Sequence, residues 1–183
     1  SHLFKAEVPG GVTVERMQPR LAETAKILWK TYVVLTVLEV ILLKLGGVEF
    51  FDALCHSLST VATGGFATHN TSIGYFNSVY VESISILFMF LGGVSFALHY
   101  QLVNSNIRTV IKNPELRFYS SMILIGVALA TWGISSSSPD LTLDESFRKA
   151  AFNVVSINTT SGFVTDDFNT WINFLRIFML VIM

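Results

Sequence analysis

Four apolar runs, separated by polar segments, restrict what this sequence can fold into. They cover residues 29–46, 76–103, 119–134 and 171–183. A helix that crosses a bilayer needs about 20 predominantly apolar residues, and the last run stops short of that length. The composition points the same way, because 51% hydrophobic residues, 14% charged residues and a mean hydropathy of +0.57 leave too little polar surface to cover a soluble globule. We therefore expect an all-α membrane protein that is incomplete at its C-terminus.

The placement of basic residues predicts the orientation of the runs. Lysine and arginine precede the first run and recur in the link 104–118, whereas residues 67–78 and 133–146 contain neither. The cytoplasmic segments of membrane proteins are enriched in these residues. We expect a cytoplasmic or interfacial linker at 1–28, which lacks the apolar core of a signal peptide, and a cytoplasmic link at 104–118. The net charge of −1 gives no indication of a nucleic-acid partner.

The segment VEFFDALCHSLST, residues 48–60, is helical in pattern but too short to span a bilayer. It is followed by TVATGGFATHN, which places Gly64 and Gly65 in a polar stretch between two apolar runs. Irregular backbone is tolerated at membrane depth only where protein or a water-filled cavity satisfies it. The pattern predicts a helix that enters the membrane from outside and returns through a loop.

The same unit occurs twice. Aligned without a gap, residues 50–70 and 147–167 share seven identities: Phe50/Phe147, Ala53/Ala150, Ser59/Ser156, Thr63/Thr160, Gly65/Gly162, Phe66/Phe163 and Thr68/Thr165. Apolar runs flank both copies, and internal repeats are common in transport proteins. We predict two tandem repeats of outer helix, pore helix, filter loop and inner helix: a complete one at 29–103 and one at 119–183 that is truncated in its inner helix.

Loops of this kind suit potassium. Rings of backbone carbonyls can replace the hydration shell of the ion, and consecutive carbonyls point to one axis when residues alternate between ordinary and positive-φ conformations. Glycine reaches positive φ at little cost, which assigns this role to Gly65 and Gly162. Thr63 and Thr160 can add hydroxyl oxygens, and the preceding short helices direct their negative C-terminal ends at the cation.

At these residues the chain resembles the TrkH/TrkG/KtrB superfamily of bacterial potassium uptake proteins, and most of all its TrkH members. Thr63-Gly64-Gly65-Phe66 and Thr160-Ser161-Gly162-Phe163 are similar to the degenerate potassium-channel filter of that superfamily. The longer strings LCHSLSTVATGGFATHNTSIGYF, AAFNVVSINTTSGF and NPELRFY add to the resemblance, which extends over essentially the whole chain.

The resemblance implies a multi-pass protein of the bacterial inner membrane, surrounded by lipid, that takes up potassium and is not an enzyme. It implies four filter repeats in one polypeptide, of which residues 1–183 supply the second and most of the third. It further implies a homodimer gated by a cytosolic nucleotide-binding ring of the TrkA or KtrA type, with potassium as the transported ion and no organic cofactor in this chain. The implied potassium-binding filter consists of Ala62, Thr63, Gly64, Gly65, Thr159, Thr160, Ser161 and Gly162.

Other residues allow more than one interpretation. Gly92 and Gly93 form either a gating hinge in the inner helix or a site of close helix packing, and packing is the simpler explanation. Glu39 and Glu82 lie in apolar runs, where an ionisable group is a functional candidate, although a structural ion pair or a position at the membrane boundary explains them as well. For Arg176 we have no physical basis for choosing between the permeation path and a contact with another repeat.

Two further classes of function are open at this stage. A secondary transporter with a midplane substrate site also uses repeats and interrupted helices, but its breaks often carry carboxylates, and neither Thr-x-Gly-Phe stretch contains one. An intramembrane hydrolase could use Cys55 or Ser57 with His56, yet the sequence places no acid partner beside them, and a packed helix face is the better explanation.

Overall fold

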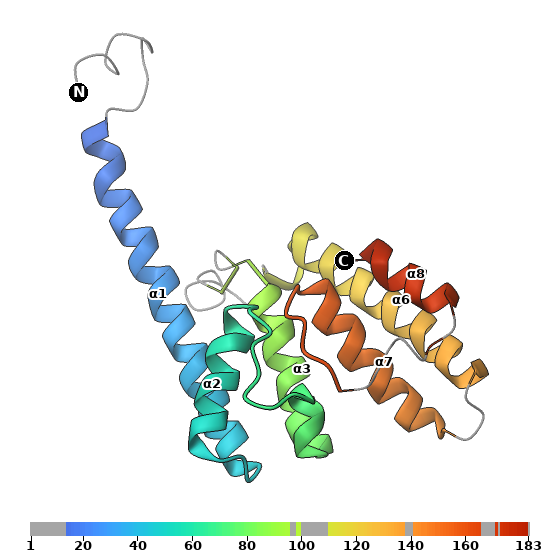
Figure 1. Ribbon diagram of the computed structural model, residues 1–183. Helices are drawn as coiled ribbons and strands as arrows, with labels where there is room; N and C mark the ends of the chain where they lie inside the picture. Colours follow the sequence, from blue (N-terminus) through green and yellow to red (C-terminus); the bar gives the residue numbers. More distant parts are fainter. Residues whose placement is uncertain are drawn as a thin grey trace.

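The computed structural model describes residues 14–95, 98–99, 110–137, 141–165, 171 and 173–182, and every regular element in these ranges is a helix (Figure 1). In chain order they are α1 (Val14–Leu45), α2 (Phe50–Val61), the 3₁₀ helix η2 (Ser72–Phe76), α3 (Val79–Gly93), α6 (Pro114–Ser137), α7 (Leu143–Asn158) and α8 (Asn173–Ile182). The prediction of an all-α fold is confirmed for the described residues.

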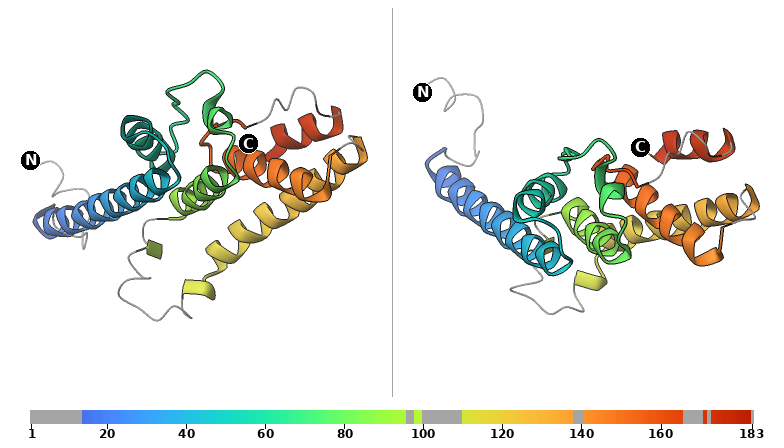
Figure 2. Two further views of the ribbon diagram at one scale, coloured as in Figure 1. Left: turned by 90° about the horizontal axis from the view of Figure 1, so that it is seen from below. Right: turned by 60° about the horizontal axis from the view of Figure 1, so that its bottom comes forward.

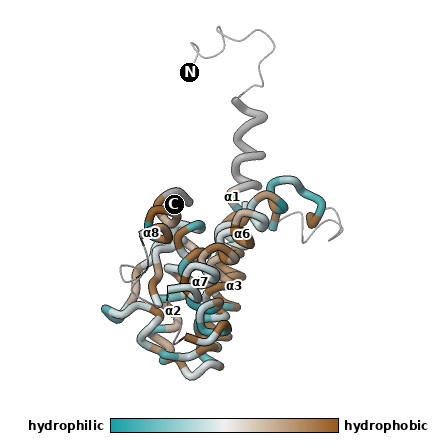
Figure 3. The backbone as a smooth tube through the Cα atoms, turned by 90° about the vertical axis from the view of Figure 1, so that its right-hand side faces the viewer, coloured by the Kyte–Doolittle hydropathy of each residue, from teal (hydrophilic) through white to brown (hydrophobic). Residues whose placement is uncertain are grey.

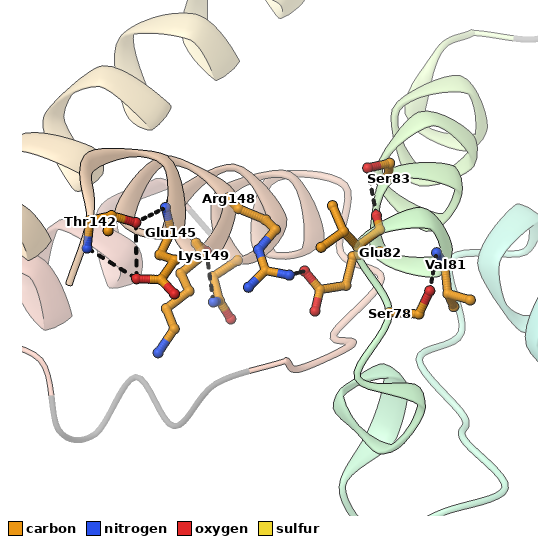
Figure 4. Close-up of polar contacts among 10 residues, drawn as sticks. Ser78, Val81, Glu82, Ser83, Thr142, Glu145, Arg148 and Lys149 are labelled. Carbon is orange, nitrogen blue, oxygen red and sulfur yellow. Dashed lines mark hydrogen bonds and ion pairs between the residues drawn. The ribbon is translucent and has the colours of Figure 1, made fainter.

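The order of the elements follows the predicted repeat. A long helix, α1 or α6, is followed by a short one, α2 or α7, then by irregular chain and a further helix, α3 or α8. The two short helices have 12 and 16 residues, fewer than a bilayer crossing needs. The short helix α7 begins at a capping box, in which Thr142 and Glu145 satisfy each other's backbone amides (Figure 4).

Helix α3 is central to the arrangement. It packs against α2 on one side and α7 on the other, while α1 lies along α2 and α6 along α7 (Figures 1 and 2). The larger of two buried clusters joins the two halves and includes Met89 of α3, Phe152 of α7, Leu175 of α8 and Phe163 of the loop after α7. The two repeats therefore form one packed body around α3.

Apolar residues lie along much of the helices, whereas hydrophilic residues lie mostly in the loops (Figure 3), and many large apolar side chains of the helices are exposed. Among the described residues, only α6 has both the length and the uninterrupted apolar composition of a membrane-crossing helix, and α3 is a shorter apolar helix. Helix α1 is long enough, but its apolar half carries Lys30, Glu39 and Lys44. Large exposed side chains such as Val34, Ile41 and Leu124 suit an apolar environment outside this chain.

The inner helix of the first repeat differs from its prediction. The apolar run 76–103 suggested one continuous helix, but α3 ends at Gly93 and Val94 is extended, with φ −77° and ψ 138°. Two side chains satisfy the carbonyls at this end: the Tyr119 hydroxyl donates to the Phe90 carbonyl at 3.1 Å, and His99 Nε2 donates to the Leu91 carbonyl at 2.9 Å. The helix therefore ends at two glycines, which have low helix propensity, and at carbonyls that distant side chains cap. A hydropathy pattern detects neither feature, so the run looked continuous.

Candidate functional site

The two loops after the short helices share an alternating backbone. Thr63 and Gly65 have φ of +50° and +69°, and Thr160 and Gly162 have +57° and +73°. Gly64 and Ser161, which separate them, are not in the positive-φ region. The positive φ predicted for Gly65 and Gly162 is confirmed. That of the two threonines was missed, because a β-branched residue rarely adopts this conformation and nothing in the sequence indicates it.

Backbone amides of both loops point back to the helix that precedes them. In the first loop, Thr63 N–H donates to the Thr60 carbonyl at 3.0 Å and Gly64 N–H to the Ser59 carbonyl at 2.7 Å. The equivalent bonds of the second loop run from Thr160 N–H to the Ile157 carbonyl at 3.0 Å and from Ser161 N–H to the Ser156 carbonyl at 2.9 Å. Two repeats that share few identities thus make the same hydrogen bonds.

These bonds determine where the carbonyl oxygens lie. The described chain has no cis peptide, and in a trans peptide the C=O group points opposite to the N–H group of the next residue. The carbonyls of Ala62, Thr63, Thr159 and Thr160 are therefore directed away from the short helices. Each loop presents consecutive backbone oxygens on one side, an arrangement that can bind a dehydrated cation.

The two loops touch each other. A Cβ atom placed on Gly65 would lie 2.1 Å from the Ser161 carbonyl oxygen and 3.2 Å from its carbonyl carbon, so only glycine fits here. The side of the loops that faces away from this contact is open. Ala62, Gly64, Thr160 and Gly162 are exposed, and a Cβ on Gly162 would meet nothing within 4 Å. The structure thus places all eight predicted filter residues on two touching loops, and among them Thr159 and Ser161 have buried side chains.

The side chains of Thr159 and Ser161 stabilise the second loop. The Thr159 hydroxyl donates to the Val155 carbonyl at 2.8 Å and lies 2.9 Å from the Ser161 hydroxyl. The first loop has alanine and glycine at these positions and cannot form this pair. The sequence repeat therefore conceals a difference in how the two loops are supported.

At the outer end, the chain after the first loop is attached to α2. His69 Nε2 lies 3.2 Å from Asp52 Oδ2, and the His69 ring stacks on Tyr75 with ring centroids 3.6 Å apart. A hydrogen bond with Thr68, and then the contact with His69, hold the pKa of Asp52 below its usual value. Asp52 thus connects the start of α2 to the chain that follows the first loop.

This attachment predicts a pH dependence. Because the pKa of Asp52 is lower in the folded state, its stabilising contribution is present above the ordinary value of 3.8 and is lost as the pH falls through the lowered value. We expect Asp52→Asn to lower the melting temperature at pH 5 to 7, and this difference to shrink below pH 3.8. The control is Glu49→Gln, because Glu49 makes no side-chain cap bond to α2. A difference between Asp52→Asn and wild type that is independent of pH down to pH 2 would contradict the attachment.

A second connection joins the two repeats. Val164, just after the second loop, donates its N–H to Ser72 Oγ and accepts at its carbonyl from Gly74 N–H, both at 3.3 Å. Ser72 and Gly74 belong to η2 of the first repeat. This contact fixes the chain after the second loop against η2 of the first repeat, and nothing in the sequence indicated it.

Gly92 and Gly93 lie behind both loops. A Cβ on Gly92 would come within 3.3 Å of the Thr60 carbonyl oxygen at the end of α2. A Cβ on Gly93 would lie 2.5 Å from the Tyr119 hydroxyl and 3.0 Å from Thr159 Cγ2. The glycines permit close packing of α3 against the ends of the two short helices, as the packing interpretation expects. A role as a hinge stays a prediction.

The two glutamates differ. Glu82 pairs with Arg148 of α7, with 3.4 Å between Glu82 Oε2 and Arg148 Nη1, so its interpretation as a structural ion pair is confirmed (Figure 4). For Glu39 the interpretation as an ion pair is wrong within the described residues, and a position at the membrane boundary stays a prediction. Its side chain is fully buried, and neither carboxylate oxygen reaches hydrogen-bond geometry with a partner in the described part of the chain, although it lies towards Thr60. Hydropathy alone could not separate these two environments.

The remaining candidates have structural explanations. The buried ring of His56 contacts Phe76 and Phe163 and lies 3.3 Å from the Thr68 hydroxyl, which fits a packed helix face better than a partner of Cys55 or Ser57. Arg176 Nε donates to the Trp171 carbonyl at 3.0 Å within its own segment. Among the described residues, no group of histidine, cysteine, aspartate or glutamate is arranged to hold a metal ion.

Comparison with known proteins places this geometry in a family context. Residues 3–183 match the TrkH family, described as a cation transport protein. The chain is 38% identical over 182 residues to the Trk system potassium uptake protein TrkH of Salmonella typhimurium, covering 97% of this chain and 37% of the relative. It is 41% identical over 170 residues to TrkH of Halomonas elongata, covering 92% and 35%.

A solved structure is also similar. The crystal structure of the potassium transporter TrkH from Vibrio parahaemolyticus superposes with a TM-score of 0.83 at 33% identity, over 96% of this chain and 37% of that one. This chain therefore spans a little over a third of the length of the relatives it matches.

Proposed function

The chain belongs to the TrkH family of cation transport proteins, and from this premise we propose that it forms part of a potassium-selective pore for uptake into the cell. The observation that carries the proposal is the pair of touching loops with alternating backbone and carbonyls on one side. The potassium uptake function named for the relatives supports it.

In this mechanism potassium exchanges water for backbone oxygens. The carbonyls of Ala62, Thr63 and Gly65 line one wall of the path, and those of Thr159, Thr160 and Ser161 a second. Gly64 separates Thr63 from Gly65 in the first wall, and Gly162, with positive φ, follows Ser161 in the second. The C-terminal ends of α2 and α7 add a negative potential behind the loops without a fixed charge. A smaller ion such as sodium gains less from oxygens held at this spacing, which gives selectivity.

The remaining parts of the proposal concern what surrounds this chain. Repeats at 29–103 and 119–183 supply two walls, and further repeats of the same polypeptide complete the pore. The full protein is a multi-pass homodimer in the bacterial inner membrane, surrounded by lipid. It is regulated by a cytosolic nucleotide-binding ring of the TrkA or KtrA type, and it transports potassium without an organic cofactor. Gly92 and Gly93, at the end of α3, are the candidate hinge.

A secondary transporter is less well supported. Its substrate site would be expected to carry carboxylates at an interrupted helix. Helix α3 ends at Gly93, but Glu82 is paired with Arg148 and Glu39 is buried in α1. Backbone oxygens are the chemical groups that the two loops offer.

The test is ion flux through the complete protein in liposomes. We expect thallium and rubidium, which substitute for potassium, to pass at least about tenfold faster than sodium. Protein-free liposomes are the control. Equal flux of all three ions, or uptake that requires an organic substrate, would contradict the proposal.

A further inference from the structure

Equivalent serines in the two short helices bond to the chain beyond each filter glycine. Ser59 Oγ accepts a hydrogen bond from Phe66 N–H, and Ser156 Oγ donates one to the Phe163 carbonyl, both at 2.7 Å. Ser59 and Phe66 align with Ser156 and Phe163 in the sequence repeat. Ser156 is fully buried and Ser59 is 8% exposed, so water competes little for either hydrogen bond.

The same serines hold the filters at a second point through their backbones. The Ser59 carbonyl accepts from Gly64 N–H at 2.7 Å, and the Ser156 carbonyl accepts from Ser161 N–H at 2.9 Å and Gly162 N–H at 3.3 Å. One residue in each repeat thus contacts both the middle and the far end of its filter. The glycine between these two contacts, Gly65 in the first loop and Gly162 in the second, therefore has little freedom to rotate.

We propose that Ser59 and Ser156 are positioning residues that determine ion selectivity by holding the filter carbonyls in place from behind. The inference rests on the proposed function as a potassium pore. Its physical basis is that selectivity depends on the position and number of coordinating carbonyls, so a peptide that can rotate away from the path weakens discrimination.

The two serines act on different peptides. Because Phe66 N–H points to Ser59, the Gly65 carbonyl points away from α2, to the side of the ion path. In the described part of the chain, this peptide is held at its N–H alone. The Phe163–Val164 peptide is held on both sides, since Val164 N–H also donates to Ser72 Oγ. Loss of Ser59 should therefore have the larger effect.

The chain offers matched controls in the same helices. The hydroxyls of Ser57 in α2 and Ser146 in α7 are also fully buried, but they have no hydrogen-bond partner in the described residues. Ser57→Ala and Ser146→Ala remove the same atom as Ser59→Ala and Ser156→Ala, without breaking a contact to the filter.

The experiment measures rubidium and sodium flux through the complete protein in liposomes. We expect Ser59→Ala to lower the rubidium to sodium ratio about tenfold, the effect of one lost hydrogen bond, and Ser156→Ala to lower it less. Adding Ser72→Ala to Ser156→Ala should bring the ratio down to that of Ser59→Ala. Ser57→Ala and Ser146→Ala should keep the wild-type ratio. If Ser59→Ala protein is not recovered, Ser59→Cys keeps most of the volume with a weaker hydrogen-bonding group, and Ser57→Cys is its control.

A Ser59→Ala ratio equal to that of Ser57→Ala would overturn the inference, as would equal loss in all four single variants, which would indicate a general effect of removing buried serines. Failure of the proposed function is distinguishable, because wild-type protein would then not discriminate rubidium from sodium.

Discussion

Replacing Gly65 by alanine in the complete protein should lower the potassium to sodium flux ratio at least about tenfold. The left-handed conformation costs a residue with a Cβ roughly 1–2 kcal/mol, which by itself corresponds to about a tenfold change in an equilibrium. Gly65 has φ +69°, and its added Cβ would lie 2.1 Å from the Ser161 carbonyl oxygen. Because that oxygen belongs to the second wall of the proposed pore, we expect relief of the clash to displace the groups that would bind the ion.

Substitutions at two other glycines distinguish the effect of the clash from the effect of backbone strain at positive φ. Gly162 has φ +73° but an added Cβ would meet nothing within 4 Å, so Gly162→Ala should reduce the ratio less than Gly65→Ala. Gly47 has φ +86° and equally open surroundings, but it lies between α1 and α2, outside the filter. Gly47→Ala should lower thermal stability and leave the ratio unchanged. Equal flux ratios in Gly65→Ala and Gly47→Ala would contradict the assignment of Gly65 to the filter.

Residues 1–183, expressed without further repeats, should give no selective flux. The two loops form neighbouring walls, and their other side leaves Ala62, Gly64, Thr160 and Gly162 exposed. An ion that is coordinated by these two walls alone recovers too little of its hydration energy to enter. In a bilayer the same open side would place polar backbone against lipid, at a cost of several kcal/mol for each unsatisfied group.

The measurement is thallium flux through liposomes that contain residues 1–183, compared with liposomes that contain the complete protein and with empty ones. We expect the first to match the empty liposomes. Selective flux from residues 1–183 would mean that two repeats, or two copies of them, are sufficient, and would replace the four-repeat account with a two-repeat subunit.

Much of the fold and of the candidate site could be predicted from local features of the sequence. The short helix α2 follows from its apolar spacing and α7 from its alignment with α2, and the aligned repeat identified Gly65 and Gly162 as positions that need positive φ. These features depend on one residue type or on a few neighbouring residues. The touching of the two loops could be expected from the repeat only in outline, because the sequence does not give the distance between repeats.

The features that were missed depend on contacts between distant parts of the chain. The end of α3 at Gly93 depends on Tyr119 of the other repeat, and the chain after the second filter depends on Ser72 and Gly74. Thr63 and Thr160 adopt positive φ against their own preference, because the helix ends and the neighbouring peptides are hydrogen-bonded around them. Glu39 looked equivalent to Glu82 in the sequence, and only packing separates a buried carboxyl from a paired one.

The central claim, that the loops 62–65 and 159–162 bind the permeating ion, is tested most directly by anomalous diffraction from crystals of the complete protein grown with thallium. The account predicts anomalous peaks on the carbonyl side of both loops, within about 3 Å of the oxygens of Thr63 and Thr160. Weaker peaks there in Gly65→Ala crystals would support the geometry further. Strong thallium peaks elsewhere along the pore, with none between these loops, would contradict it.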